Sequence, residues 1–94
     1  MNIFAEYLNK ISTLVLENKN FLQLDNLNNF KGVTVESPPS DFNCDLSSNI
    51  CLVMAKLNKT NPKDLANKIK NLIITKMNDF EDILIAGPGF LNLK

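Results

Sequence analysis

Residues 83–93 read Ile-Leu-Ile-Ala-Gly-Pro-Gly-Phe-Leu-Asn-Leu, and this stretch does most to decide the fold class. Its large and β-branched apolar residues predict one strand over residues 83–85 and another over residues 90–93. Gly87-Pro88-Gly89 turns the chain between them. The two strands suit an antiparallel hairpin, but a turn that contains proline does not by itself require one. A further strand is predicted over residues 33–36, where Val-Thr-Val-Glu alternates before two prolines that cannot donate to a sheet.

Apolar residues that recur every three or four positions predict three helices. The first covers residues 3–17, and the third covers residues 62–77 with Asn61 as its N-cap and proline in the first helical position. For the second helix we predict Asp45 as the N-cap and an end near Asn58.

Residues 18–32 show no clear periodic pattern. Their asparagines favour turns, while Phe21, Leu22 and Leu24 either dock on the core or form a short strand. The sequence shows no linker and no internal repeat. It therefore predicts a single domain over residues 1–94, with an α+β fold in which three helices pack on one face of a small antiparallel sheet.

The composition limits the kinds of site that the chain can form. Its 94 residues include ten lysines, ten acidic residues and no histidine or arginine. Without histidine, the commonest general base and metal ligand is missing, and two cysteines cannot complete a four-cysteine zinc site. We therefore expect no catalytic residue, no metal site and no cofactor-binding residue in this chain. The zero net charge also implies that any contact with RNA is local.

The cysteine count and the lengths of the apolar runs indicate the cellular compartment of the protein. Cys44 and Cys51 are too few for a disulfide scaffold, and we expect both to be reduced, with Cys51 buried and inert. The first residues lack the pattern of a secretory signal, and the run at residues 50–55 is too short to span a bilayer. We expect a cytoplasmic protein with no membrane partner.

Four groups of residues occur in a characteristic order. Residues 35–39 (Val-Glu-Ser-Pro-Pro) lead to 45–49 (Asp-Leu-Ser-Ser-Asn), a later helix opens with Asn61-Pro62, and 86–92 read Ala-Gly-Pro-Gly-Phe-Leu-Asn. This order resembles the amino-terminal domain of arginyl-tRNA synthetases. The resemblance covers residues 33–94 well, while the preceding residues match only as a leading helix.

One part of the resemblance departs from the family pattern. The family often has His-Gly-Asp where this chain has Asn43-Cys44-Asp45. Cysteine adopts positive φ less readily than glycine. We therefore expect the loop before Asp45 to have a different backbone conformation from that of the family. No function is carried over to Asn43 or Cys44.

The resemblance implies what the longer protein does. The full enzyme of this family uses ATP to attach arginine to tRNA(Arg). We expect this chain to be a non-catalytic piece of such an enzyme, with ATP bound elsewhere in the full-length protein. Its expected partners are the catalytic domain of the same chain and, weakly, the D-loop of tRNA(Arg), and we expect a monomer. In the family, the aromatic and the amide matched here by Phe90 and Asn92 approach an unpaired D-loop base.

The alternation of side chains in a strand gives an independent interpretation of these two residues. Phe90 and Asn92 share one face and Leu91 and Leu93 the other, so Phe90 and Asn92 face solvent if the leucines face the helices. An exposed ring can stack on an RNA base, and an amide can read its edge. Equally, Phe90 can be a core residue, and Asn92 can be a turn or sheet-edge residue without a ligand. The alternative function is a protein-interaction or interdomain packing module without RNA contact.

Overall fold

The computed structural model describes residues 2–38 and 44–94. Pro39 and residues 40–43 of the predicted loop lie outside this part of the chain. None of the helices in the described part has the length and apolar character needed to cross a membrane. The described elements are, in order, α1 Ile3–Glu17, η1 Asn28–Phe30, β1 Val35–Glu36, β2 Leu46–Ser48, α2 Ile50–Asn58, α3 Pro62–Lys76, β3 Ile83–Ala86 and β4 Phe90–Leu93.

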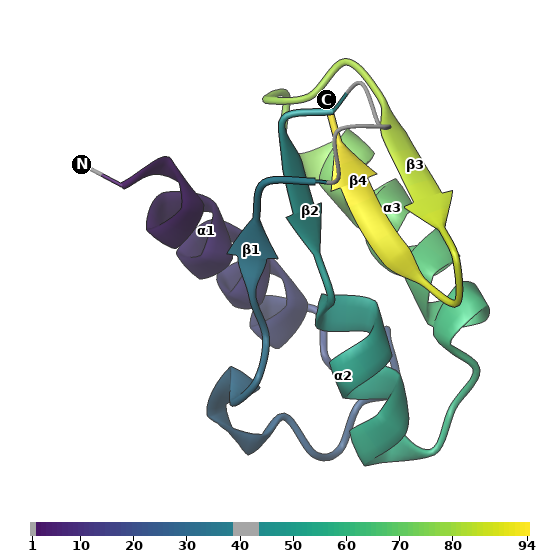
Figure 1. Ribbon diagram of the computed structural model, residues 1–94. Coiled ribbons are helices and arrows are strands. Elements are labelled where there is room, and N and C mark those ends of the chain that lie inside the picture. The colour runs from purple at the N-terminus through teal and green to yellow at the C-terminus, as the bar shows by residue number, and fades with distance from the viewer. Residues whose placement is uncertain (1, 39–43) are drawn as a thin grey trace.

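The four strands form one antiparallel sheet in the order β1-β2-β4-β3 (Figure 1). β3 and β4 pair from Ile83 with Leu93 to Ala86 with Phe90, which confirms the hairpin. β2 pairs with the other side of β4, where Leu46 lies opposite Leu93. β4 is therefore a central strand with a neighbour on each side.

The helices cover one face of this sheet, so the predicted α+β arrangement is confirmed. α3 lies behind β3 and β4 in Figure 1, while α1 contacts β1 and α2 contacts β4. A fully buried aliphatic side chain contributes about 1.5–3 kcal/mol to stability. The strand residues buried against the helices include Val35, Leu46, Ile83, Leu91 and Leu93.

Asparagine side chains begin α1 and α3. The Oδ1 atom of Asn2 accepts a hydrogen bond from the backbone N–H of Phe4 at 2.9 Å, and that of Asn61 accepts one from Lys63 at 2.9 Å. Such a cap contributes about 1 kcal/mol, because it satisfies a backbone donor that has no partner within the helix. α1 has the predicted bounds, and α3 ends one residue earlier than predicted, with Met77 as its C-cap.

The start of the second helix differs from the prediction. Asp45 is not an N-cap, because Leu46–Ser48 forms β2 and α2 begins only after Asn49. The Asn49 side chain joins this helix start to the chain before β1. Its Oδ1 accepts from the Thr34 backbone N–H at 2.7 Å, and its Nδ2 donates to the Gly32 carbonyl at 3.0 Å.

The helical pattern of residues 46–48 does not decide their structure. These residues pair with β4, and this pairing overrides the local helical pattern.

Residues 18–32 dock on the core, which was one of the two predicted possibilities. Leu22 and Leu24 are buried, and the segment contains no strand. Phe21 instead points into solvent, with an exposed fraction of 63%. Asn58, at the end of α2, holds the segment by accepting from two of its backbone N–H groups at 2.9 Å each.

Gly89 closes the β3–β4 turn in a conformation that few other residues adopt. Its φ is +146°, and a Cβ added there would lie 3.2 Å from the Cβ of Pro62 at the start of α3. Gly89→Ala is expected to lower the free energy of unfolding by about 1–3 kcal/mol, measured by urea denaturation. Gly87→Ala is the matched control, because Gly87 has φ of +56° but open space around it. An equal loss in both variants would contradict a role for crowding against Pro62.

Candidate functional site

The face of the sheet opposite the helices carries a row of side chains from all four strands. Glu36 pairs with Ser47, Ser47 pairs with Asn92, and Asn92 pairs with Leu84. Directly paired residues point to the same face, so these four side chains form what we call the cross-strand row. Phe90 lies two residues before Asn92 on β4 and shares this face.

A cavity of about 560 Å³ opens on this face of the sheet. It exceeds two other surface hollows, of about 330 and 380 Å³, and it falls within the range of about 300–1,000 Å³ typical of ligand pockets. The structure thus brings the two residues singled out by the sequence into one concave site. The described lining residues are Glu36, Ser37, Pro38, Ser47, Ala86, Gly87, Pro88, Phe90 and Asn92.

Phe90 is not a core residue. Its exposed fraction is 40%, whereas the neighbouring Leu91 is fully buried against the helices. The ring stands at the end of the hairpin turn and lines the cavity. An exposed aromatic ring at the wall of a cavity offers a flat surface on which another planar group can stack.

Asn92 is buried, so the prediction that it faces solvent is wrong. Its exposed fraction is 1%, although it belongs to the face opposite the helices. The reason is its position on the central strand. Ser47 and Leu84 flank it on the two neighbouring strands, and Phe90 precedes it on the same face. The alternation along one strand gives the face of a side chain but not what covers it.

The side-chain oxygen of Asn92 is a hydrogen-bond acceptor for which residues 2–38 and 44–94 provide no donor. The oxygen itself is buried. A buried acceptor without a donor costs about 1–3 kcal/mol, and native structures contain few of them. Because Asn92 lines the cavity, a ligand that donates an N–H or O–H group there would remove this penalty. The site is therefore suited to a planar ligand with a hydrogen-bond donor.

Glu36 and Ser47 are members of this site that the sequence alone does not identify. The helical interpretation of residues 45–58 places Ser47 on a helix, away from any strand. β2 has only three residues. In so short a run, the spacing of apolar residues cannot distinguish a strand from the start of a helix. Among the described lining residues, Glu36 carries the only charge and none is basic.

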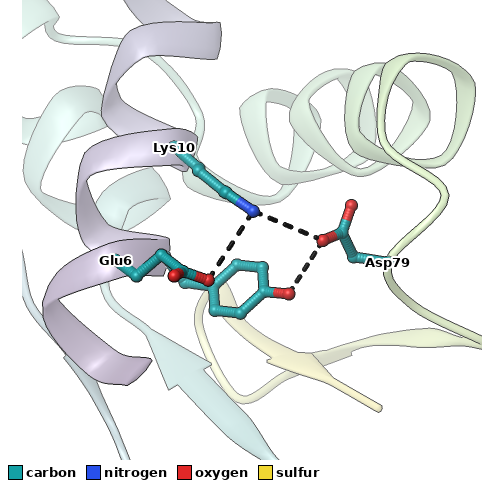
Figure 2. Close-up of polar contacts among 4 residues, drawn as sticks. Glu6, Lys10 and Asp79 are labelled. Carbon is teal, nitrogen blue, oxygen red and sulfur yellow. Dashed lines mark hydrogen bonds and ion pairs between the residues drawn. The ribbon is translucent and has the colours of Figure 1, made fainter. Parts of the chain in front are cut away.

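A polar cluster between α1 and the segment after α3 has a structural role (Figure 2). Lys10 on α1 lies 3.6 Å from Glu6 and 3.7 Å from Asp79 in the segment after α3. The Tyr7 hydroxyl donates to the same Asp79 carboxylate at 2.8 Å, which raises the pKa of Tyr7 above its ordinary value. Exposed ion pairs of this kind contribute about 0–1 kcal/mol each. The Tyr7 ring also packs against Phe80, with centroids 5.2 Å apart, so the cluster joins α1 to the chain between α3 and β3.

The two cysteines are free thiols in different surroundings. Cys51 is fully buried in α2, and burial raises the pKa of its thiol to about 12. It therefore stays protonated and unreactive at neutral pH, as predicted. Cys44 is half-buried. No cluster of three or more possible metal ligands lies within residues 2–38 and 44–94.

Comparison with known proteins gives the family. The model of the family described as "Arginyl tRNA synthetase N terminal domain" matches residues 2–94. The chain belongs to this family.

The relatives of this arginyl-tRNA synthetase domain are longer proteins, each matched over only part of its length. The arginine–tRNA ligase of Pelagibacter ubique (strain HTCC1062) is 42% identical over 94 residues, which is 100% of this chain and 16% of that protein. The arginine–tRNA ligase of Agrobacterium fabrum (strain C58) is 37% identical over 98 residues, with the same shares. That of Rickettsia akari (strain Hartford) is 44% identical over 59 residues, or 63% of this chain and 10% of the relative. The chain thus spans about a sixth of the length of the relatives that it matches throughout.

Proposed function

We propose that this domain binds the D-loop of tRNA(Arg) at the outer corner of the tRNA, with an unpaired base in the cavity beside Phe90 and Asn92. The base stacks on the exposed ring of Phe90, and its edge donates a hydrogen bond to the Oδ1 atom of Asn92. RNA-binding proteins commonly read unstacked bases through this combination of an aromatic face and an amide.

The observation that carries the proposal is the buried Asn92 oxygen, which has no donor among the described residues and belongs to the cavity that Phe90 lines. Burying an acceptor without a donor costs free energy, and a ligand that donates to it would remove that cost. The family membership adds support, because the related proteins are named as ligases of arginine and tRNA.

The binding is expected to be weak. Stacking contributes about 1–3 kcal/mol per base, whereas micromolar affinity needs about 8 kcal/mol. The chain has no net charge, so it lacks the general attraction to phosphate that most RNA-binding proteins use. The domain therefore adjusts the affinity and specificity for a tRNA that the rest of the enzyme also holds.

Phe90→Ala is expected to weaken RNA binding about 5- to 100-fold, because it removes the stacking surface. Isotope-labelled domain is titrated with tRNA(Arg) and followed by NMR chemical shifts. Phe21→Ala is the matched control, since Phe21 is also exposed but lies in the segment after α1. A D-arm hairpin and an anticodon-arm hairpin, titrated separately, test which part of the tRNA is bound.

The proposal predicts shifts around β4 that appear with tRNA(Arg) and the D-arm hairpin and are reduced only in Phe90→Ala. Equal affinities for the parent chain, Phe90→Ala and Phe21→Ala would overturn the assignment of the base to this cavity. Equal affinities for the two hairpins would overturn the assignment to the D-loop.

The family membership supports a proposal for the activity of a longer protein that contains this domain. The enzyme to which this domain belongs is proposed to attach arginine to tRNA(Arg) with ATP as the energy source, in a catalytic domain outside these 94 residues. This domain then contributes neither the ATP site nor the arginine site. Aminoacylation by the full-length enzyme, measured with and without residues 1–94, tests the contribution of the domain to tRNA use.

One observation favours the alternative function of an interdomain packing module. Leu84 is 47% exposed beside Asn92 in the cross-strand row, and exposed apolar side chains suit a protein partner. If the sheet face packs on protein, tRNA causes no shifts in β4. A folded catalytic domain, added in trans, would then shift the signals of Leu84 and Phe90 instead.

A further inference from the structure

We propose that a groove beside the end of β4 holds the segment that follows Lys94 in the longer protein, and that this segment contributes an apolar side chain flanked by a lysine or arginine. The inference rests on one part of the proposed function, which is that the rest of an arginyl-tRNA synthetase follows this domain. It does not depend on RNA binding, because this groove and the cavity beside Phe90 share none of their described lining residues.

The groove lies where the start of α1 meets β2 and the segment after α3, and we call it the exit groove. Its volume is about 380 Å³. Ile3 is 51% exposed at its edge, while the aromatic rings within it are half-buried. A further apolar side chain placed there would remove apolar surface from water. The apolar members of the described lining are Ile3, Phe4, Tyr7, Leu46 and Phe80.

The end of β4 leads directly to the exit groove. The Asp45 backbone N–H donates to the Leu93 carbonyl at 2.8 Å, and Asp45 itself lines the groove. The Lys94 carbonyl accepts from the Glu81 backbone N–H at 2.7 Å, and Glu81 directly follows Phe80, another lining residue. The chain after Lys94 therefore begins beside the exit groove.

The relatives indicate how much chain is close enough to fill the groove. The family is that of an amino-terminal domain, and the length of this chain is 16% of each relative that it matches throughout. In a protein of that kind, a long stretch of chain follows this domain. A segment attached through a short linker has an effective concentration on the order of millimolar. Even a contact of weak intrinsic affinity is then formed most of the time.

The charges around the exit groove favour a basic peptide segment over RNA. Asp45, Glu81 and Asp82 are exposed near the end of β4, and none of them forms an ion pair within the described part of the chain. Asp79 also lines the groove, but it is already paired with Lys10. Carboxylates without a cationic partner attract lysine or arginine and repel phosphate. The occupant is therefore expected to place a basic side chain beside its apolar one.

Hydrogen–deuterium exchange tests the docking on three chains, which are residues 1–94, the same chain extended to the start of the catalytic domain, and the full-length enzyme. The amides of residues 3–7 and 79–82 are expected to exchange at least about tenfold more slowly in both longer chains than in residues 1–94, because the docked segment covers them. The amides of residues 18–24 are the internal control, and their exchange is expected to be the same in all three chains.

Variants at the edge of the groove test its chemistry in the full-length enzyme. Ile3→Gln is expected to speed the exchange of the protected amides at least about fivefold, with Ile74→Gln as the matched control, since Ile74 is 53% exposed on α3. Asp45→Lys reverses the charge where the chain leaves β4 and is expected to have the same effect. Its control is Asp25→Lys, since Asp25 is exposed in the segment after α1. The NMR spectrum of residues 1–94 carrying each substitution verifies that the fold is intact.

The outcomes separate the occupants of the groove. Protection that appears in the extended chain and is lost in Ile3→Gln and Asp45→Lys supports the proposal. Protection in the full-length enzyme alone overturns it, because a later part of the enzyme would then cover the groove. Equal exchange in all three chains overturns docking at the groove altogether.

Two further measurements distinguish this inference from other interpretations. Sedimentation of residues 1–94 as a dimer that Ile3→Gln dissociates would overturn the proposal, because a second copy would then occupy the groove. Phe90→Ala is expected to leave the protection of the groove unchanged, and Ile3→Gln is expected to leave the titration with tRNA(Arg) unchanged. Loss of the groove protection in Phe90→Ala would contradict the independence of the two sites, so failure of the base site and failure of this inference are separate results.

Discussion

Replacing Leu91 with alanine is expected to lower the free energy of unfolding by about 2–5 kcal/mol. Leu91 is fully buried in β4, the central strand that pairs with β2 on one side and with β3 on the other. Truncation leaves a cavity between the sheet and the helices that neighbouring side chains fill only in part. Native domains have only about 5–15 kcal/mol of stability, so a loss of this size is a large share of the total and shifts unfolding to a clearly lower urea concentration.

Urea denaturation followed by circular dichroism measures this loss. Leu16→Ala serves as the control, because Leu16 is 47% exposed on α1 and alanine is an equally good helix former. The control is expected to change the free energy of unfolding by no more than about 0.5 kcal/mol. Similar losses in the two variants would show that Leu91 is not the buried centre that the structure describes.

Replacing Asn92 with leucine is expected to stabilise the domain while weakening RNA binding. The substitution removes a buried acceptor that has no donor in the described part of the chain. The expected gain is about 1–3 kcal/mol in the free energy of unfolding, which is the penalty for leaving such a group unsatisfied. The same change removes the acceptor that is proposed to contact the base edge, so the affinity for tRNA(Arg) is expected to fall about tenfold.

The combination of the two effects is the informative result. Asn78→Leu is the matched control, since Asn78 is exposed in the segment after α3 and is expected to change stability by no more than about 0.5 kcal/mol. A loss of both stability and binding in Asn92→Leu would indicate that Asn92 supports the fold rather than the ligand. A gain in stability without any loss of affinity would contradict its proposed contact with the base.

The sequence predicts the elements with strong local signals. α1 and α3 combine a regular apolar stripe with an asparagine cap, so their bounds are correct to within one residue. β2 has no such signal. Leu46 and Ile50 are four residues apart, which fits a helix as well as a strand, and the pairing that decides between them involves β4 at the far end of the chain.

In the candidate site, too, some properties follow from neighbouring residues in the sequence, and others depend on strands that are distant in the sequence. The exposure of Phe90 follows from the alternation along β4 once the leucines are known to face the helices. The burial of Asn92 depends on Ser47 and Leu84, which belong to two other strands. The inclusion of Glu36 depends on the register between β1 and β2. The spacing of residues along one strand predicts neither the burial of Asn92 nor the inclusion of Glu36.

The order of strands in the sheet has a consequence for how the domain folds. Leu46 pairs with Leu93 across about half of the chain, whereas the helices and the β3–β4 hairpin form between near neighbours. Closing a long loop costs conformational entropy before the new contacts compensate for it, so we expect the β2–β4 pairing to form late. Because the cavity is lined by side chains from both of these strands, we expect it to form only when that pairing does, later than the helices.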